Sequence, residues 1–185
     1  MFDVKAAEAM EAGIKVVTYD TDIRTSSNRL SYIGTNNYEA GKRLGQQGAL
    51  DLKDRGITQG KLTTVTYSGS AQNMVERYRG LQDGFDEAMG EDAGHFTWCQ
   101  WIINDLSVSR AREQLETQIM SYPDLRAVFT LGTESVITGT MEAIRSQKRE
   151  GILYHYGFDY SPTLAAGGDE GLITGIVDQN SKAIG

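Results

Sequence analysis

The sequence predicts an α/β fold with a doubly wound, mostly parallel sheet. Short apolar segments typical of strands alternate along the whole chain with helical patterns of roughly 10 to 18 residues. This alternation is typical of β-α-β units, whose crossovers are right-handed and whose strands pair in parallel. No shift in composition, internal repeat or low-complexity segment interrupts the 185 residues. A linker between separate domains is therefore not indicated.

The first predicted elements are a helix and a strand. Apolar residues within 4–12 indicate a helix that ends at Gly13, because glycine readily takes the left-handed conformation at a helix C-terminus. The segment 14–19 (IKVVTY) is predicted to be a strand, and Asp20 follows it directly. A polar stretch then leads to a short apolar piece at 30–33.

The remaining elements repeat a strand-then-helix order. Asn36 is the expected cap of the next helix, because Glu39 lies three residues further on, as in a capping box. His155 falls inside a predicted strand, where a structural role is the usual one for a histidine. Strands are expected at 60–67, 96–103, 127–131, 152–158 and 172–177. Helices are expected from Asn36, at 73–89, 107–121, 133–146 and 159–166, and at the end of the chain.

Composition and charge exclude several classes of function. A formal net charge of −7 argues against binding to the phosphate backbone of nucleic acids. No apolar run approaches the roughly 20 residues of a membrane helix, and no signal-peptide pattern follows Met1. The single cysteine, Cys99, excludes an internal disulfide, and with two histidines it makes a zinc site implausible. We expect no metal and no cofactor.

Polar side chains follow every predicted strand. Ligands of open α/β sheets bind at the carboxyl ends of the strands, so these side chains are expected to gather at one edge. Carboxylates, amides and an arginine suit the hydroxyl groups of a sugar, and nearby aromatic rings could stack on its ring. For any single position a loop or helix cap is the simpler interpretation. The residues concerned include Asp20, Asp22, Ser68, Gln72, Asn73, Arg77, Asn104, Asp105, Thr133, Glu134, Asp159, Asp178 and Gln179.

One enzymatic alternative stays open at this point. Asp20-Thr21-Asp22 after an apolar strand resembles the nucleophile and acid pair of phosphatases of the haloacid-dehalogenase type, which bind Mg²⁺. Arg24 stands where that motif has threonine or valine, and its later lysine and acidic pair are not apparent. The chain also lacks a G-x-S-x-G elbow, an H-E-x-x-H motif and a glycine-rich phosphate loop. We therefore expect a protein without catalytic activity.

Six segments, taken in order, carry a resemblance to a known family. They are AAEAMEAGIKVVTYDTD (6–22), SYIGTNNYEAGKRLG (31–45), NMVERYRGLQDGFDEAM (73–89), YPDLRAVFTLGTESVITGTMEAI (122–144), YGFDYSP (156–162) and ITGIVDQNSKAIG (173–185). The set resembles the sugar-binding members of the type I periplasmic binding proteins, the ribose-binding-protein group that serves ABC transporters. The resemblance implies two α/β lobes, joined by three crossing strands, with a sugar between them. It also implies a periplasmic or lipid-anchored extracellular protein.

The resemblance implies ligand-binding roles for particular residues. Asp20 and Asp159 fall on aspartates that end one strand in each lobe of the family. Arg77, in N-x-x-x-R-x-x-G, falls on the arginine that binds sugar hydroxyls and the ring oxygen, and Gln179 lies beside the last crossing. Thr21 stands where ribose binders have arginine, which argues against ribose itself. The expected ligand-binding set is Asp20, Asn73, Arg77, Thr133, Glu134, Asp159 and Gln179.

Two regions depart from the family pattern or match it loosely. Thr133 and Glu134 stand where the family often has Asn-Asp. The family's aromatic wall has no clear counterpart, and the candidates for its place are Trp98, Trp101 or Asn104.

The resemblance also predicts an organisation into lobes. Residues 1–35 are expected to be a remnant of the first lobe with one crossing, 36–177 a complete second lobe, and 178–185 the return into the first lobe. On this expectation the chain is truncated at both ends, and the helix and strand within 4–19 expose apolar faces. Residues 1–33 are then expected to be mobile, or paired with a second copy in a homodimer.

The resemblance also implies partners. They are a sugar and the permease of an ABC transporter, without nucleic acid or membrane insertion. The effector-binding domain of a LacI-type regulator is an alternative with the same fold.

Overall fold

The computed structural model describes residues 2–132 and 134–179, which form two parallel sheets. A two-stranded sheet pairs β1 (Val17–Tyr19) with β2 (Ser31–Ile33). A six-stranded sheet has the order β4-β3-β6-β7-β8, and β5 also pairs with β3. Its strands are β3 (Gly60–Thr66), β4 (Phe96–Trp98), β5 (Ile102–Ile103), β6 (Leu125–Thr130), β7 (Tyr154–Phe158) and β8 (Gly175–Val177). All these pairings are parallel, which confirms the predicted fold class.

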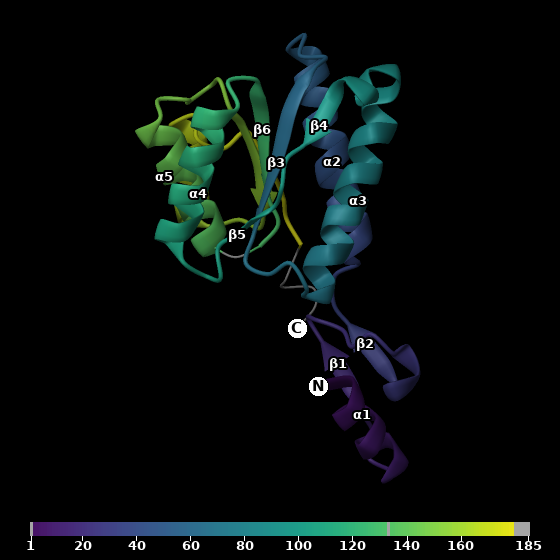
Figure 1. Ribbon diagram of the computed structural model, residues 1–185. Coiled ribbons are helices and arrows are strands. Elements are labelled where there is room, and N and C mark those ends of the chain that lie inside the picture. The colour runs from purple at the N-terminus through teal and green to yellow at the C-terminus, as the bar shows by residue number, and fades with distance from the viewer. Residues whose placement is uncertain (1, 133, 180–185) are drawn as a thin grey trace.

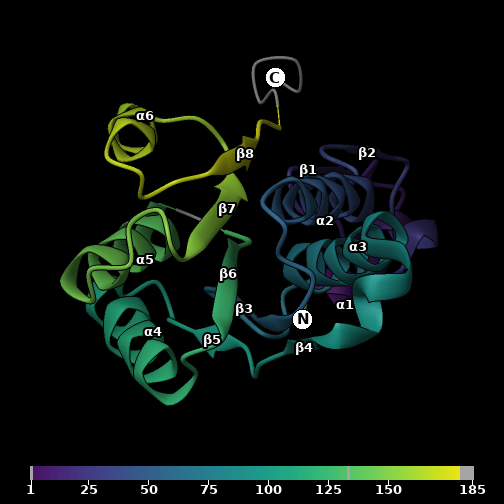
Figure 2. The same ribbon diagram turned by 90° about the horizontal axis from the view of Figure 1, so that it is seen from above.

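Helices cover both faces of the larger sheet (Figures 1 and 2). On one face lie α2 (Asn37–Asp54) and α3 (Gln72–Met89). On the other face lie α4 (Val108–Ser121), α5 (Glu134–Ser146) and α6 (Pro162–Asp169). Side chains of β6 alternate between the two faces, so Phe129 belongs to the core under α2 and α3, and Val128 to the core under α4 and α5. We call residues 37–179 the large unit.

A small unit, residues 2–33, projects from the large unit in Figure 1. It contains α1 (Phe2–Glu11), β1, the short 3-10 helix Ser26–Asn28 and β2. The Asp3 carboxylate at the start of α1 accepts hydrogen bonds from the backbone N–H groups of Arg24 (3.3 Å) and Thr25 (2.7 Å), which ties the helix to the loop after β1. Large apolar side chains of this unit are exposed: Phe2, Val4, Ile14, Val17, Tyr19, Leu30 and Ile33. Those within 4–19 confirm the exposed apolar faces that were predicted there.

The helices α2 and α3 approach each other at backbone contact distance. A Cβ added to Gly41 of α2 would lie 2.0 Å from the carbonyl oxygen of Arg77. A Cβ added to Gly80 of α3 would lie 2.0 Å from the carbonyl oxygen of Tyr38. Only glycine permits this approach, which brings the first turn of α2 beside Arg77.

One predicted strand, 96–103, is two short strands instead. In a regular strand Trp98 and Trp101 would point to opposite faces, because side chains alternate. Here both rings contact Tyr78 of α3, with ring centroids 5.9 Å and 4.3 Å from it, so the alternation breaks between them. Cys99 still donates its N–H to the Leu62 carbonyl (2.7 Å), which keeps the segment beside β3.

The other local predictions largely agree with the structure. The Asn36 side chain accepts the backbone N–H of Glu39 (3.1 Å), which confirms the predicted helix cap. His155 is fully buried in β7, with both ring nitrogens within 3.0 Å of a polar partner, as expected of a structural histidine. The helix predicted at the end of the chain lies outside the described residues.

Candidate functional site

The strand order of the larger sheet defines one place for a ligand. After β3 the chain runs through α3 to β4 at one edge, and after β5 it returns through α4 to β6 on the other side of β3. The order therefore reverses between β3 and β6, and α3 and α4 lie on opposite faces (Figure 2). Ligands of open α/β sheets bind at the carboxyl ends of the strands at such a reversal. Arg77 lies there, because its Nη1 donates to the carbonyl of Leu131, directly after β6 (2.8 Å).

Arg77 is held from several elements. Its side chain extends from α3, and the residue is only 6% exposed. Nε donates to Oδ1 of Asn37 in the first turn of α2 (2.9 Å), and Nη2 donates to Oε1 of Gln179. The guanidinium carbon lies 4.3 Å from the ring centroid of Phe158, the last residue of β7. Burial lowers the pKa of Arg77, and the negative charge of Asp159 acts in the opposite direction.

The amide of Gln179 bridges Arg77 and Asp159. Its oxygen accepts from the guanidinium, and its Nε2 donates to both carboxylate oxygens of Asp159 at 2.8 Å. The amide is therefore oriented with its acceptor toward the cation and its donor toward the anion. Among the described residues, no carboxylate forms a direct ion pair with Arg77.

Asp20 and Asp159 share one backbone setting. Each directly follows a strand and has a left-handed conformation, with φ of 62° for Asp20 and 67° for Asp159. The N–H of Asp20 donates to Ile33 of β2 (3.0 Å), and the N–H of Asp159 donates to Val177 of β8 (2.9 Å). Aspartate tolerates this conformation better than most residues, and such strained positions are concentrated at functional sites.

Asn73 connects the two units. Its Nδ2 lies 3.1 Å from the hydroxyl of Tyr67 and 3.5 Å from Oγ1 of Thr21. Thr21 in turn donates to a carboxylate oxygen of Asp20 (3.2 Å). Tyr32 connects the end of β1 to the residues between the two units. Its hydroxyl lies 2.7 Å from the carbonyl oxygen of Asp20, directly after β1, and 3.0 Å from the carbonyl oxygen of Thr35.

A groove of about 670 Å³ opens between the small unit and the start of α3. Its size falls in the range of about 300–1,000 Å³ typical of small-molecule sites. Carboxylates, amides and aromatic rings all line the groove. Its lining includes Thr21 and Asn73, the two residues whose side chains connect the small unit to α3. The lining residues are Phe2, Asp3, Thr18, Tyr19, Thr21, Asp22, Ile23, Arg24, Tyr67, Ala71, Gln72 and Asn73.

The structure gathers most of the predicted site residues around the ends of β1, β3, β6 and β7: Asp20, Asn73, Arg77, Asp159 and Gln179. Glu134 is exposed at the first residue of α5 and takes no part in the hydrogen bonds that join this group. Thr133 lies outside the described residues. Trp98 and Trp101 pack on Tyr78, and Asn104 is buried in a turn, where its Nδ2 donates to the Ser107 carbonyl (3.0 Å).

Sequence reasoning missed Asn37. The residue is 5% exposed, and its only apparent signal is its place directly after Asn36. Because Asn36 already caps α2, a second asparagine has no capping task and is free to bind elsewhere. Its Nδ2 donates to the Thr35 carbonyl (3.2 Å) while its Oδ1 accepts from Arg77.

The geometry of Asp22 does not favour the phosphatase alternative. Arg29 donates to both carboxylate oxygens of Asp22, with Nε 2.6 Å from Oδ1, and Thr18 donates to Oδ1 at 2.7 Å. The hydrogen bonds from Arg29 are the largest cause of the lowered pKa of Asp22. A general acid requires a raised pKa, so Asp22 is unsuited to protonate a leaving group.

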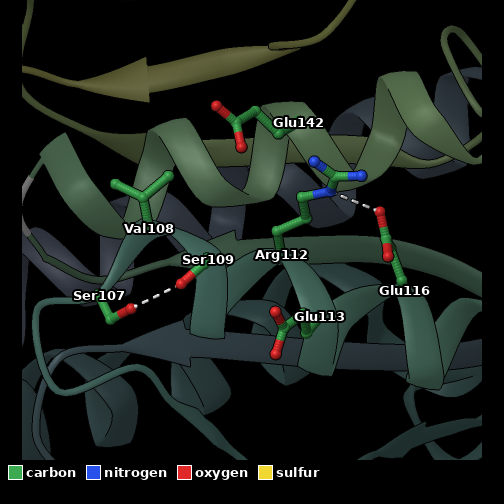
Figure 3. A pocket seen from close by; sticks show the side chains of 7 residues that line it. All are labelled: Ser107, Val108, Ser109, Arg112, Glu113, Glu116 and Glu142. Atoms are coloured by element: carbon green, nitrogen blue, oxygen red, sulfur yellow. Dashed lines mark hydrogen bonds and ion pairs between the residues drawn. The ribbon is translucent and has the colours of Figure 1, made fainter.

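A second hollow, of about 570 Å³, lies between α4 and α5 (Figure 3). It is on the face of the sheet opposite α3, so it is separate from the Arg77 group. Three of its seven lining residues are acidic, Glu113, Glu116 and Glu142, and the Nε of Arg112 is paired with Glu116 at 2.8 Å. No aromatic ring is among its lining residues, so it offers no stacking surface.

The fold and the Arg77 group together define a doubly wound α/β protein with a cluster of polar side chains at the switch point of its sheet. The chain belongs to the family of the periplasmic binding protein domain, whose family model matches residues 5–185. Within 2–132 and 134–179, every helix is too short or too polar to span a lipid bilayer.

Known proteins of this family are similar over nearly the whole chain. The glucose-galactose binding protein GanP from Geobacillus stearothermophilus is 27% identical with a TM-score of 0.84, over 99% of this chain and 61% of that one. A solute-binding protein of an ABC transporter from Burkholderia graminis, in complex with D-arabinose, is 26% identical with a TM-score of 0.80, over 94% and 57%. The D-ribose/D-allose-binding protein of Pseudomonas aeruginosa is 24% identical over 180 residues, 93% of this chain and 52% of its relative. The chain thus spans about half the length of this curated relative.

Proposed function

We propose that this chain is the sugar-binding part of a solute receptor for an ABC transporter, and that it binds a neutral monosaccharide or related polyol without catalysis. The observation that supports this most is the joined group of Arg77, Gln179 and Asp159 at the switch point. A guanidinium offers several N–H donors and a carboxylate only acceptors, and a hydroxyl can satisfy both at once. The adjacent groove adds amides and aromatic rings of the kind that contact sugar rings.

The similar proteins support the ligand class. GanP is described as a glucose-galactose binding protein, and the Burkholderia graminis protein was solved with D-arabinose. In this chain Asp20, Asn73, Arg77 and Asp159 are proposed to bind the hydroxyls, with Gln179 beside them. Glu134, the first residue of α5, remains a proposed contact, as does Thr133, which lies outside the described residues.

The proposal extends to organisation and partners. Residues 1–35 would belong to a first lobe, 36–177 to a second, and 178–185 to the return between them. The partner of the closed receptor would be the permease of the transporter, at a periplasmic or extracellular location.

The exposed apolar side chains of the small unit support a further proposal, a homodimer through that unit. A regulator of the LacI type is not favoured, since GanP and the Burkholderia graminis and Pseudomonas aeruginosa proteins are described as binding proteins.

The test is a thermal-shift screen against D-arabinose, D-glucose, D-galactose, D-ribose, D-allose and a sugar alcohol. A ligand that binds only the folded state raises its stability by RT ln(1 + [L]/Kd), about 2.7 kcal/mol at 100 Kd. We expect at least one sugar to raise Tm in the unchanged chain, and the shift to vanish in Arg77→Lys. Lysine keeps the charge but cannot reach Asn37, Leu131 and Gln179 together.

The matched control is Arg112→Lys, which changes an exposed arginine on α4 and should keep the shift. Failure of every sugar to raise Tm, or an equal shift in Arg77→Lys, would refute a sugar site at Arg77.

A further inference from the structure

The polar group at Arg77 is already bridged by a side chain of the protein itself. The Gln179 amide accepts from the Arg77 guanidinium and donates to the Asp159 carboxylate. A sugar hydroxyl between the same two groups would make the same pair of bonds, because a hydroxyl also accepts from a guanidinium and donates to a carboxylate. The amide therefore occupies the position that a bound hydroxyl requires.

The contacts of Arg77 are of two kinds. Those to the Asn37 side chain and the Leu131 carbonyl lead to buried residues at the start of α2 and the end of β6. The contact to Gln179 leads to a half-buried residue that follows β8, in the segment after Val177. Asn37 and Leu131 thus fix the guanidinium in the large unit, and Gln179 is the partner best placed to leave.

An amide in this position also solves a problem of the unliganded site. A buried donor without an acceptor costs free energy, and a buried charge costs more. Arg77 has no direct carboxylate partner among the described residues, so withdrawal of Gln179 would leave an N–H of the guanidinium unsatisfied until water or a ligand replaced it. The Gln179 bridge supplies an acceptor to the guanidinium and a donor to the carboxylate.

We propose that Gln179 is a place-holder for the sugar: its amide fills the hydroxyl position between Arg77 and Asp159 in the free protein, and an incoming sugar must displace it. Asn37 acts as a positioning residue that holds Arg77 during the exchange. The inference rests on the proposed function and assigns Gln179 a role in the rate of binding as well as in contact with bound sugar.

The test measures association and dissociation rates by stopped-flow fluorescence, with whichever of D-arabinose, D-glucose, D-galactose, D-ribose and D-allose gives the largest thermal shift. Gln179→Leu keeps the size of the side chain and removes the bridge. Because a hydrogen bond to a charged group contributes roughly 1.5–3 kcal/mol, we expect association to become about tenfold faster or more. Gln179→Glu places a carboxylate on Arg77 and should slow association, since an ion pair is harder to displace.

A residue that only contacts bound sugar would change the dissociation rate and leave association unchanged in both variants. That result would overturn the inference while the proposed function stood. Gln118→Leu, which removes a half-buried amide of α4 bonded to the Gln100 carbonyl, is the control and should keep both rates. Circular dichroism confirms that each variant folds, and if Gln179→Leu does not fold, the direction of change in Gln179→Glu decides the question.

No binding by any variant would refute the proposed function and the place-holder with it.

Discussion

At the scale of single residues, His155 shows how the core selects a protonation state. Its Nδ1 lies 3.0 Å from the carbonyl oxygen of Leu172, which can only accept, so Nδ1 carries the proton. Its Nε2 lies 3.0 Å from the hydroxyl of Thr130 and accepts from it. Burial without a carboxylate partner lowers the pKa of His155 from about 6.5 to about 4. The neutral imidazole is therefore part of the folded core.

This pKa makes stability depend on pH in a defined window. Between pH 6.5 and 4 the unfolded chain binds a proton at this residue and the folded chain does not, so the free energy of unfolding falls as the pH is lowered. The full contribution of His155 to the free energy of unfolding is on the order of 3 kcal/mol.

Urea unfolding at pH 7.5 and pH 4.5 measures this contribution. We expect His155→Gln to show a smaller loss between the two pH values than the unchanged chain. His95→Gln, at an exposed position, should keep the full loss, and an equal loss in His155→Gln would contradict the assignment.

Residue by residue, the sequence indicated part of the site. Asp159 directly follows a strand, and Arg77 lies one turn into the helix after another strand of the same sheet. Because parallel strands bring their carboxyl ends to one edge, the meeting of these two residues could be predicted. Asn37 could not, because its contact with Arg77 depends on how closely α2 approaches α3. The bridging position of Gln179 could not be predicted either, because a pattern of residue types does not indicate the conformation of a side chain.

At the scale of elements, the contact between α2 and α3 depends on glycine. Gly80→Ala would force its new methyl group against the Tyr38 carbonyl, and backbone has little room to shift. We expect a loss of about 1–3 kcal/mol in the free energy of unfolding, measured with urea. The matched control is Gly168→Ala in α6, where a Cβ meets nothing within 4 Å. That change should stabilise the chain by up to about 1 kcal/mol, because alanine favours a helix. Equal stability of the two variants would show that α2 and α3 can separate freely.

Most elements of the large unit could be predicted from periodicity, and the exception has a specific cause. The segment 96–103 is predicted to be one continuous strand because six of its eight residues are apolar or aromatic. Two tryptophans three residues apart reach one tyrosine on α3, and this long-range contact overrides the local preference for a straight strand. Short-range patterns cannot show such a contact.

At the scale of the whole molecule, the small unit is rich in exposed apolar side chains, because seven of the fourteen large ones among the described residues lie within 2–33. Parallel strands are normally covered on both faces, yet Tyr19 is 59% exposed and its pairing partner Ile33 is 47% exposed. We expect the chain to self-associate as its concentration rises, and Tyr19→Thr with Ile33→Thr to weaken this association. Light scattering after gel filtration over a range of concentrations measures it.

Ile152→Thr is the control for this prediction, because it removes a side chain of similar exposure from the large unit and should leave the association unchanged. A single monomeric species at every concentration would contradict a homodimer through the small unit.

The net charge of −7 gives that apolar surface a further consequence. Mutual repulsion between acidic molecules opposes the association of their small units in neutral solution, and this repulsion weakens as the pH approaches the pI of about 4.9. The same acidification begins to protonate unfolded chains at His155, so folded molecules lose stability in the range where they also lose their repulsion. Preparations of this protein should therefore precipitate on mild acidification, and buffers well above neutrality should keep it in solution.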